Sequence, residues 1–388
     1  MKKRFSFLCV LLIIFSYCCF EVHGLSVSAS SAVLMVAETG EVIFEKNAHQ
    51  RKGMASTTKI MTALLTAECA TPEKVVVTTA EMVNVEGTSM GLKPGDKVTY
   101  HDLIYGMLLA SGNDAANTAA ISIDGSLASF AKRMNRRAAE IGMKNTNFVT
   151  PSGLDDENHY STAYDMALLG CCALRNSFFL EACSSYSAKL CYGNEPYTRY
   201  LTNHNKLLKS FDGTIGIKTG FTKKSGRCLV SAVIRNGVTL VCVTLNAPDD
   251  WNDHKKMFEY GFERVTVKNI DTELPYLKVI GGDEKFVPLS LSCGLQVPST
   301  CDISEFEVEL CIKHFEYAPI KRGEPVGEVR IIFNGNSIFS STVIADKNVM
   351  CTTEEKVDNY SVLNRVKKFF NDLSLSFKSI FKRKADGI

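Results

Sequence analysis

The sequence predicts an α+β protein: a domain with an antiparallel sheet and helices on both of its faces, a small all-β sandwich domain, and a C-terminal amphipathic helix. Three observations support this order. Up to about residue 262, runs with helical spacing of apolar residues occur between shorter runs that alternate like strands. From about residue 265 only short alternating runs follow, separated by turn residues. The last segment returns to helical spacing and is rich in lysine and arginine.

The chain begins with a pattern typical of export. Charged residues 2–4 precede an apolar run over residues 7–20, which is too short to span a bilayer comfortably. We therefore expect a secretory signal peptide over residues 1–29, cleaved near Gly24 or Ala29. The formal net charge is only +2, so nucleic acid is not an expected partner.

Eleven of the fourteen cysteines follow the signal peptide, which is an odd number. None has the spacing of a zinc site, and adjacent Cys171 and Cys172 would not easily bridge on one helix. We expect most of them to be small buried hydrophobic residues in a reducing or anaerobic setting, with a disulfide as the alternative. Histidines also lack ligand spacing, so neither a metal nor another cofactor is expected.

The first domain is expected to span residues 30–264. Its strands are predicted at residues 32–36, 42–45, 216–222, 227–234 and 238–245. The last two are joined by Asn236-Gly237, a dipeptide strongly typical of a two-residue hairpin turn. A helix over residues 253–260 is expected to end the domain.

A Ser-x-x-Lys motif at Ser56 and Lys59 opens the first long helical pattern. The apolar run that follows predicts a core-facing helix with Ser56 in its first turn. Because residues three apart share a helix face, the Lys59 amine would lie beside the Ser56 hydroxyl. The helix N-terminus would also offer free amide hydrogens to an oxyanion. The alternative is that Ser56 only caps the helix, and the same motif recurs at Ser129 and Ser379 without this setting.

Ser111-Gly112-Asn113 interrupts a helical pattern that covers residues 101–110 and resumes over residues 115–123. This break would place a hydroxyl and an amide at the top of a core. The alternative is structural, with Gly112 ending one helix and Asn113 capping the next.

Lys218-Thr219-Gly220 lies within an alternating segment that predicts an exposed strand. Glycine inside a strand usually marks the close approach of another backbone or a ligand. Such an edge would pair with an extended peptide while Lys218 and Thr219 bind an anionic group. The alternative is a solvated lysine that protects an edge strand from aggregation.

Residues 265–353 are expected to form the β-sandwich, with strands at residues 286–291, 306–312, 326–333 and 338–343. Residues 354–388 are predicted to be an amphipathic helix, in which an apolar stripe including Phe369 and Phe377 lies on one face and clustered lysines and arginines cover the rest. We expect this helix to lie in the membrane interface and to bind anionic lipid best. Packing on the β-domain is the alternative.

Together the three motifs supply a nucleophile with an adjacent amine, a hydroxyl with an amide, and a cationic strand edge, which suits acyl transfer through a serine ester. The chain resembles the penicillin-binding D-alanyl-D-alanine carboxypeptidases of low molecular mass, serine peptidases with the fold of the β-lactamases and transpeptidases. The resemblance runs from about residue 30 to the C-terminus. It is most specific at residues 55–63, 109–116, 153–167 and 216–222.

The resemblance implies that the chain removes the C-terminal D-alanine of peptidoglycan pentapeptide stems through an acyl-enzyme on Ser56. Lys59 would be the base, which requires a lysine pKa lowered by burial or by another cation, here Lys218. Asn113 would orient Lys59 and the substrate amide, and Ser111 would relay a proton to the departing amine.

Lys218 and Thr219 would hold the terminal carboxylate, with Gly220 and Phe221 completing the substrate-binding edge. The resemblance also implies an oxyanion hole made by the backbone amides of Ser56 and Phe221, each worth about 3–4 kcal/mol in comparable hydrolases. β-Lactams would acylate Ser56 and be released slowly.

The resemblance further implies a peripheral protein on the outer face of the bacterial cytoplasmic membrane. His159 lies in the matching segment 153–167, where the family uses the stretch mainly as a structural loop, and a chemical role is the alternative. Two other functions remain open: a β-lactamase, or a wall-binding homologue without catalysis.

Overall fold

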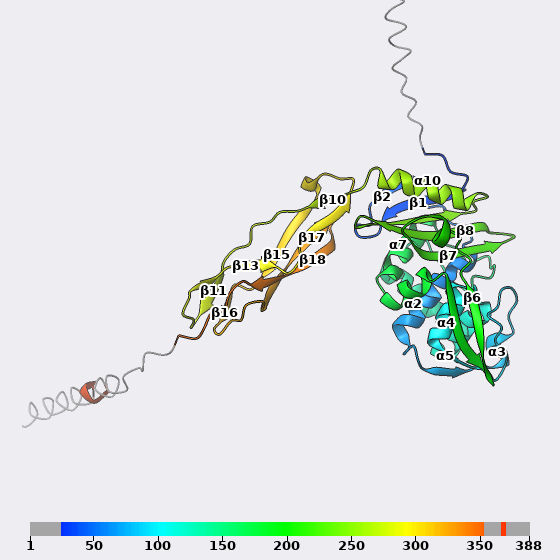
Figure 1. Ribbon diagram of the computed structural model, residues 1–388, viewed down its shortest axis with the longest axis horizontal. Helices are drawn as coiled ribbons and strands as arrows, with labels where there is room; N and C mark the ends of the chain where they lie inside the picture. Colours follow the sequence, from blue (N-terminus) through cyan, green and yellow to red (C-terminus); the bar gives the residue numbers. More distant parts are fainter. Residues whose placement is uncertain (1–24, 353–365, 370–388) are drawn as a thin grey trace, which may run out of the picture. The chain divides into compact units, whose positions relative to one another are not determined.

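The computed structural model describes residues 25–352 and 366–369 (Figure 1). The chain divides into two compact units: residues up to Ile270 together with Gln296–Phe306, and Asp271–Leu295 together with the residues from Glu307 onward. The predicted signal peptide (except residues 25–29) and the predicted terminal helix (except residues 366–369) lie outside the described residues. All eleven described cysteines are free, but the expectation that most are buried is wrong, since only Cys171, Cys183, Cys228 and Cys242 are buried.

A five-stranded antiparallel sheet forms the centre of the first unit (Figure 1). Its strands, in spatial order, are β2 (Val42–Lys46), β1 (Ser31–Val36), β9 (Val238–Leu245), β8 (Gly226–Arg235) and β7 (Thr214–Thr222). These are the predicted strands, with ends shifted by a residue or two. The order leaves β7 at one edge of the sheet, so one side of this strand is free of strand partners within the sheet.

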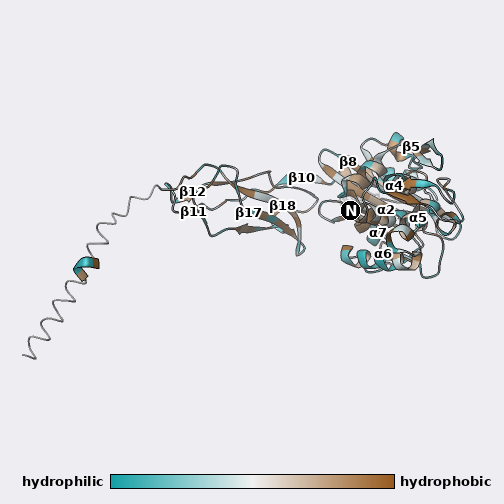
Figure 2. Ribbon diagram, turned by 90° about the horizontal axis from the view of Figure 1, so that it is seen from below, coloured by the Kyte–Doolittle hydropathy of each residue, from teal (hydrophilic) through white to brown (hydrophobic). Residues whose placement is uncertain are grey.

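Helices cover both faces of this sheet because its strands are apolar on both sides. Val33 and Met35 of β1 pack into one hydrophobic core, whereas Leu34 and Val36 pack into a second core on the opposite face. Alternate residues of a strand point to opposite faces, which explains the division. Figure 2 shows the resulting apolar residues gathered in the interior of this unit.

The first core is covered by most of the helices, and the second by α10. The helical segments of this unit are η1 (Ala55–Thr58), α2 (Lys59–Cys69), α3 (Ala80–Val83), α4 (Tyr100–Leu108), α5 (Asn113–Asp124), α6 (Leu127–Ile141), α7 (Ala163–Leu174), α8 (Ser177–Ser184), α9 (Leu207–Ser210), α10 (Asp250–Phe262) and η2 (Ile303–Glu305). The predicted helix over residues 253–260 is therefore the centre of α10.

Three two-stranded sheets complete this unit. They pair β3 (Val75–Val77) with β4 (Lys97–Thr99), β5 (Ser187–Gly193) with β6 (Pro196–Thr202), and β10 (Thr266–Asn269) with β14 (Gln296–Ser299). The β5–β6 hairpin was not predicted, because its turn contains neither Asn-Gly nor Asp-Gly.

The second unit consists of two sheets. One contains β12 (Phe286–Val287), β11 (Leu277–Ile280) and β16 (Phe315–Tyr317), and the other contains β13 (Leu289–Leu291), β18 (Asn336–Ala345), β17 (Pro325–Phe333) and β15 (Glu307–Ile312). The strand predicted over residues 286–291 is wrong in one respect, since it is split into β12 and β13. Pro288 separates them, and proline has no N–H to donate to a strand ladder.

Candidate active site

Ser56 lies in a tight 3-10 turn that precedes α2, rather than in the first turn of α2 itself. The preceding residue, Ala55, has a φ of 48°, a conformation uncommon for a residue with a side chain. The N-cap residues of η1 and α2 are Met54 and Thr58, and neither makes a side-chain cap bond. Ser56 therefore does not cap the helix. Its hydroxyl is partly exposed and accepts a hydrogen bond from Lys59 Nζ at 2.9 Å.

Lys59 is completely buried beneath this turn. Besides Ser56 Oγ, its Nζ donates to Asn113 Oδ1 and to the Ser152 carbonyl, both at 2.6 Å. Burial lowers the pKa of Lys59 well below its usual value, and the positive charge of Lys218 lowers it further. The negative charge of Asp114 acts in the opposite direction.

Asn113 is the first residue of α5, and Gly112 occupies the N-cap position without a side chain to cap. The Asn113 side chain does not cap the helix either. Its oxygen accepts from Lys59, and its Nδ2 donates to the Glu86 carbonyl at 2.6 Å. Ser111 has a φ of 59° and is nearly buried beside the cleft described below. The second motif therefore contributes side chains to a site.

The loop that carries Glu86 is held by Asp114, a residue that sequence reasoning missed. Its buried carboxylate accepts hydrogen bonds from Ser89 Oγ and from the backbone N–H groups of the next three residues. Thr88 closes the loop onto the second motif, because its carbonyl accepts from Asn113 N at 2.7 Å. The only sequence signal was an acidic residue in the first turn of a helix.

The third motif faces the nucleophile turn across a narrow gap. A Cβ atom on Gly220 would lie 3.1 Å from Ser56 N and 3.0 Å from Thr57 N, so a side chain there would require the nucleophile turn to shift by a few tenths of an ångström. Lys218 is buried, not solvated as the alternative required, and its Nζ donates to the Thr219 carbonyl at 2.8 Å. Burial lowers the pKa of Lys218 to about 7.

His159 stabilises the nucleophile turn, Ala55–Thr58, through its contact with the Thr58 hydroxyl. Its Nδ1 accepts from Val149 N at 2.9 Å, so the neutral ring carries its proton on Nε2, 2.8 Å from Thr58 Oγ1. Thr58 Oγ1 in turn donates to the Ala55 carbonyl at 2.8 Å. Burial lowers the pKa of His159 to about 4, which keeps the ring neutral. His159 does not line the cleft that Ser56 lines.

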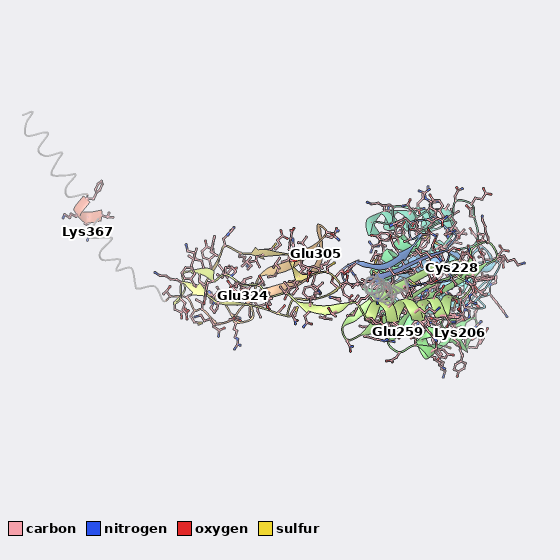
Figure 3. The ribbon with its side chains drawn as sticks, turned by 90° about the horizontal axis from the view of Figure 1, so that it is seen from above. Lys206, Cys228, Glu259, Glu305, Glu324 and Lys367 are labelled. Atoms are coloured by element: carbon pink, nitrogen blue, oxygen red, sulfur yellow. The ribbon has the colours of Figure 1, made fainter. Side chains whose placement is uncertain are left out.

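A cleft of about 900 Å³ joins these groups. Six predicted site residues line it, namely Ser56, Ser111, Asn113, Thr219, Gly220 and Phe221. Lys59 and Lys218 are buried and do not line the cleft. Its other lining residues were not predicted and include Glu86, Ser152, Asp155, His204, Arg227 and Trp251. Lys206, labelled in Figure 3, also lines the cleft, and Cys228 on β8 does not.

Two models of known protein families match the chain. Residues 19–249 match the D-alanyl-D-alanine carboxypeptidase family of peptidases, and residues 262–350 match the C-terminal domain of penicillin-binding protein 5. The chain is 32% identical over 334 residues to the D-alanyl-D-alanine carboxypeptidase DacF of Bacillus subtilis, covering 83% of this chain and 86% of that protein. It is 31% identical over 348 residues to DacC of Escherichia coli, covering 84% and 86%.

Solved structures of penicillin-binding proteins and DD-peptidases superpose on the chain. Penicillin-binding protein 5 from Haemophilus influenzae superposes with a TM-score of 0.62 at 27% identity, covering 85% of this chain and 99% of that one. The DD-transpeptidase of Streptomyces K15 superposes with a TM-score of 0.59 at 30% identity, covering 61% and 98%. The family match spans more than half of the chain, and the chain belongs to the D-alanyl-D-alanine carboxypeptidase family of penicillin-binding serine hydrolases.

Proposed function

We propose that this enzyme removes the C-terminal D-alanine from peptidoglycan pentapeptide stems through an ester formed on Ser56. The single observation that carries the proposal is the Ser56 hydroxyl, accessible from the cleft and 2.9 Å from a buried amine, Lys59 Nζ. A serine hydroxyl needs a base within hydrogen-bond reach to become a nucleophile.

Lys59 is the proposed base, and its hydrogen bonds suit both of its protonation states. The charged ammonium has three protons for its three acceptors, Ser56 Oγ, Asn113 Oδ1 and the Ser152 carbonyl. The neutral amine keeps two protons for Asn113 and Ser152, and its lone pair accepts the Ser56 proton. Burial favours the neutral amine before attack. As Ser56 Oγ bonds to the substrate carbonyl carbon, its proton passes to Lys59.

The leaving D-alanine must be protonated at its amine when the peptide bond breaks. Ser111 is the proposed relay for this proton, because it lines the cleft and adjoins Asn113, which is bonded to Lys59. Water then hydrolyses the ester and restores Ser56. The backbone N–H groups of Ser56 and Phe221 are proposed to stabilise the oxyanion, supported by the close approach of Gly220 to the nucleophile turn.

The terminal carboxylate is proposed to bind at Thr219, which lines the cleft, with Lys218 acting from behind. Lys218 Nζ donates to the Thr219 carbonyl and contributes the positive charge that it carries below its pKa of about 7. This arrangement favours anionic peptide termini and the carboxylate of β-lactams alike.

Mass spectrometry after incubation with penicillin tests the proposal. We expect a stable adduct of the intact drug on Ser56 and release of D-alanine from a synthetic acyl-D-alanyl-D-alanine peptide. Rapid turnover of the drug would instead identify a β-lactamase. Absence of both adduct and D-alanine release would identify a wall-binding protein without catalysis.

Export and peripheral attachment to the outer face of the cytoplasmic membrane are also proposed. Removal of residues 1–24 is favoured over removal of residues 1–29, because Ser28 N and Ala29 N donate to the buried Asp253 carboxylate at 2.8 and 3.0 Å. Cleavage after Ala29 would remove these bonds. The mass of the exported protein distinguishes the two sites.

Attachment is proposed through the amphipathic segment 354–388, of which the structure describes residues 366–369, a helical turn with every residue exposed. Among the described residues, no single helix has the length and apolar character needed to cross a membrane; α7 and α8 meet that test only as a pair bent by 107°. Deletion from Val362 onward is expected to release active soluble enzyme. Continued sedimentation of that variant with membranes would contradict attachment through this segment.

A further inference from the structure

The three-stranded sheet of the second unit carries an aromatic surface on one of its faces. Its central strand is β11, where Lys278 pairs with Phe286 of β12 on one side and with Phe315 of β16 on the other. In the next row, Ile280 pairs with Tyr317. Paired residues of neighbouring strands point to the same face of a sheet. These five residues therefore share one face, which we call the aromatic face.

The aromatic face is exposed, whereas the opposite face of the sheet belongs to the core of the unit. Leu277, Val279 and Val287 are buried on that opposite face. On the aromatic face, Phe286 is 54% exposed, and Phe315 and Tyr317 are 45% and 63% exposed. A sheet with one face in the core normally presents polar residues on the other. Clustered apolar side chains on that outer face are typical of an interaction surface.

The described part of this unit ends beside the aromatic face. Gly281 directly follows Ile280, and its carbonyl accepts hydrogen bonds from Thr352 N and Thr352 Oγ1, both at 2.9 Å. Thr352 stands two positions before the predicted amphipathic segment 354–388. Figure 1 shows β11 and β16 side by side in this unit. Any surface that binds the segment 354–388 is therefore brought within reach of the aromatic face.

The charges around the aromatic face do not oppose contact with an anionic surface. The sheet and its β11–β12 turn contain five charged residues, and two of the acidic ones form ion pairs with lysines outside the sheet. The five are Lys278, Asp283, Glu284, Lys285 and Glu316, with Lys347 paired to Glu284 and Lys313 paired to Glu316. Four positive charges thus accompany three negative ones.

The chemistry of the aromatic face matches the interface of a lipid bilayer. Aromatic side chains are enriched at the depth of the lipid headgroups. The rings of Phe315 and Tyr317 pack edge to face with their centres 5.6 Å apart, so they form one apolar surface. Lys278 lies between two phenylalanines, and a lysine in such a setting can bury its methylene groups while its amine contacts lipid phosphates.

We propose that the aromatic face is a second membrane contact, which lies in the interface of an anionic bilayer beside the segment 354–388. This proposal rests on the peripheral attachment proposed above, because that segment brings the sheet to the bilayer. Burial of the aromatic face adds apolar area to the attachment and strengthens it. Two contacts also restrict the orientations of this unit on the membrane more than one contact does.

The direct test introduces a tryptophan into the aromatic face of the full-length chain. Tyr317→Trp is incubated with vesicles of phosphatidylcholine and phosphatidylglycerol whose acyl chains are brominated close to the headgroup. We expect the bromine to quench the added fluorescence, with the parent chain and its single tryptophan, Trp251, as the baseline. Tyr200→Trp is the matched control and is expected to show no quenching above the baseline, because Tyr200 is 76% exposed on β6 of the first unit.

The second measurement is the affinity of the full-length chain for the same vesicles, determined by cosedimentation. The double variant Phe286→Ser, Phe315→Ser carries little risk to folding, because both side chains are exposed. It is expected to bind about tenfold more weakly, since less apolar area is buried in the interface. Tyr200→Ser is the control and is expected to bind like the parent chain.

Quenching of Tyr317→Trp together with weaker binding of the double variant supports the second contact. Absence of quenching and unchanged binding of the double variant, while deletion from Val362 onward abolishes binding, overturns the second contact and leaves attachment through the segment intact. No binding of vesicles by the intact chain overturns that attachment and, with it, the second contact.

Two other results would identify a different occupant of the aromatic face and overturn the proposal. Tighter vesicle binding by the double variant would show that the segment 354–388 itself covers the aromatic face. A lipid-free dimer of the intact chain that the double variant converts to a monomer, measured by light scattering, would show that a second copy of the chain covers it.

Discussion

Replacing Asp114 by asparagine tests whether the loop that carries Glu86 positions the catalytic amide. The Asp114 Oδ1 atom accepts from Met90 N and Ala115 N, and Oδ2 accepts from Ser89 Oγ, Gly91 N and Leu92 N. An asparagine has only one oxygen, so in either orientation its NH₂ group faces two backbone N–H donors.

The expected loss of stability follows from the number of backbone N–H donors left without an acceptor. A buried donor left without an acceptor costs about 1–3 kcal/mol, so Asp114→Asn is expected to destabilise the loop by about 2–6 kcal/mol, less where water replaces the lost acceptor. The loop then releases the Glu86 carbonyl from Asn113 Nδ2 and frees the amide that orients Lys59. Small displacements of catalytic groups reduce rates by about 10²-fold, and we expect a decrease of that order in acylation of Ser56.

The assay is the rate of acylation by a fluorescent penicillin, measured beside the melting temperature. The electrostatic effect provides a second readout, because the Asp114 charge raises the pKa of Lys59. Its removal is expected to move the acidic limb of the acylation profile to lower pH. Asp124→Asn, at the other end of α5, is the control and is expected to leave acylation unchanged. Wild-type acylation and melting of Asp114→Asn would refute the reasoning.

Three further predictions concern single side chains. Lys59→Ala is expected to slow acylation of Ser56 by about 10²–10⁴-fold, while the circular dichroism spectrum stays native. D-alanine release at the wild-type rate would exclude Lys59 as the base. Lys218→Met removes a charge that lowers the pKa of Lys59, so the acidic limb of the acylation profile should move to higher pH; an unchanged limb would contradict the coupling. His159 has a pKa of about 4 when folded, against about 6.5 when unfolded, so the unfolded chain binds the proton first as the pH falls. The free energy of unfolding should therefore fall between pH 6.5 and 4 by up to about 3 kcal/mol, and His159→Gln should flatten that dependence in urea titrations.

Much of the fold was predictable because it depends on local patterns. Asn236-Gly237 identified the β8–β9 hairpin, and alternation along residues 216–222 identified β7. The nucleophile turn was less predictable. Ser56 was expected in the first turn of the helix, but it lies in a 3-10 turn before α2, where the Thr57 and Thr58 hydroxyls donate to nearby carbonyls. Such side-chain bonds compete with helical geometry and leave no periodic signal.

The parts of the site that were missed are those supplied by backbone groups or by remote segments. The Ser152 and Glu86 carbonyls hold Lys59 and Asn113, and any residue type offers a carbonyl. Trp251 lies about 195 residues from Ser56 in the sequence, yet both line one cleft. No sequence pattern near either residue predicts that they line the same cleft.

The sequence by itself determined the reactive groups: a serine and a lysine three residues apart, a serine and an asparagine two apart, and a lysine on a strand. Only the tertiary structure decided that Lys59 is fully buried with three acceptors, and that Lys218 lies behind the wall of the cleft rather than in solvent. The physical reason is that burial and electrostatic coupling depend on all the atoms around a group. Most of those atoms come from segments far away in the chain.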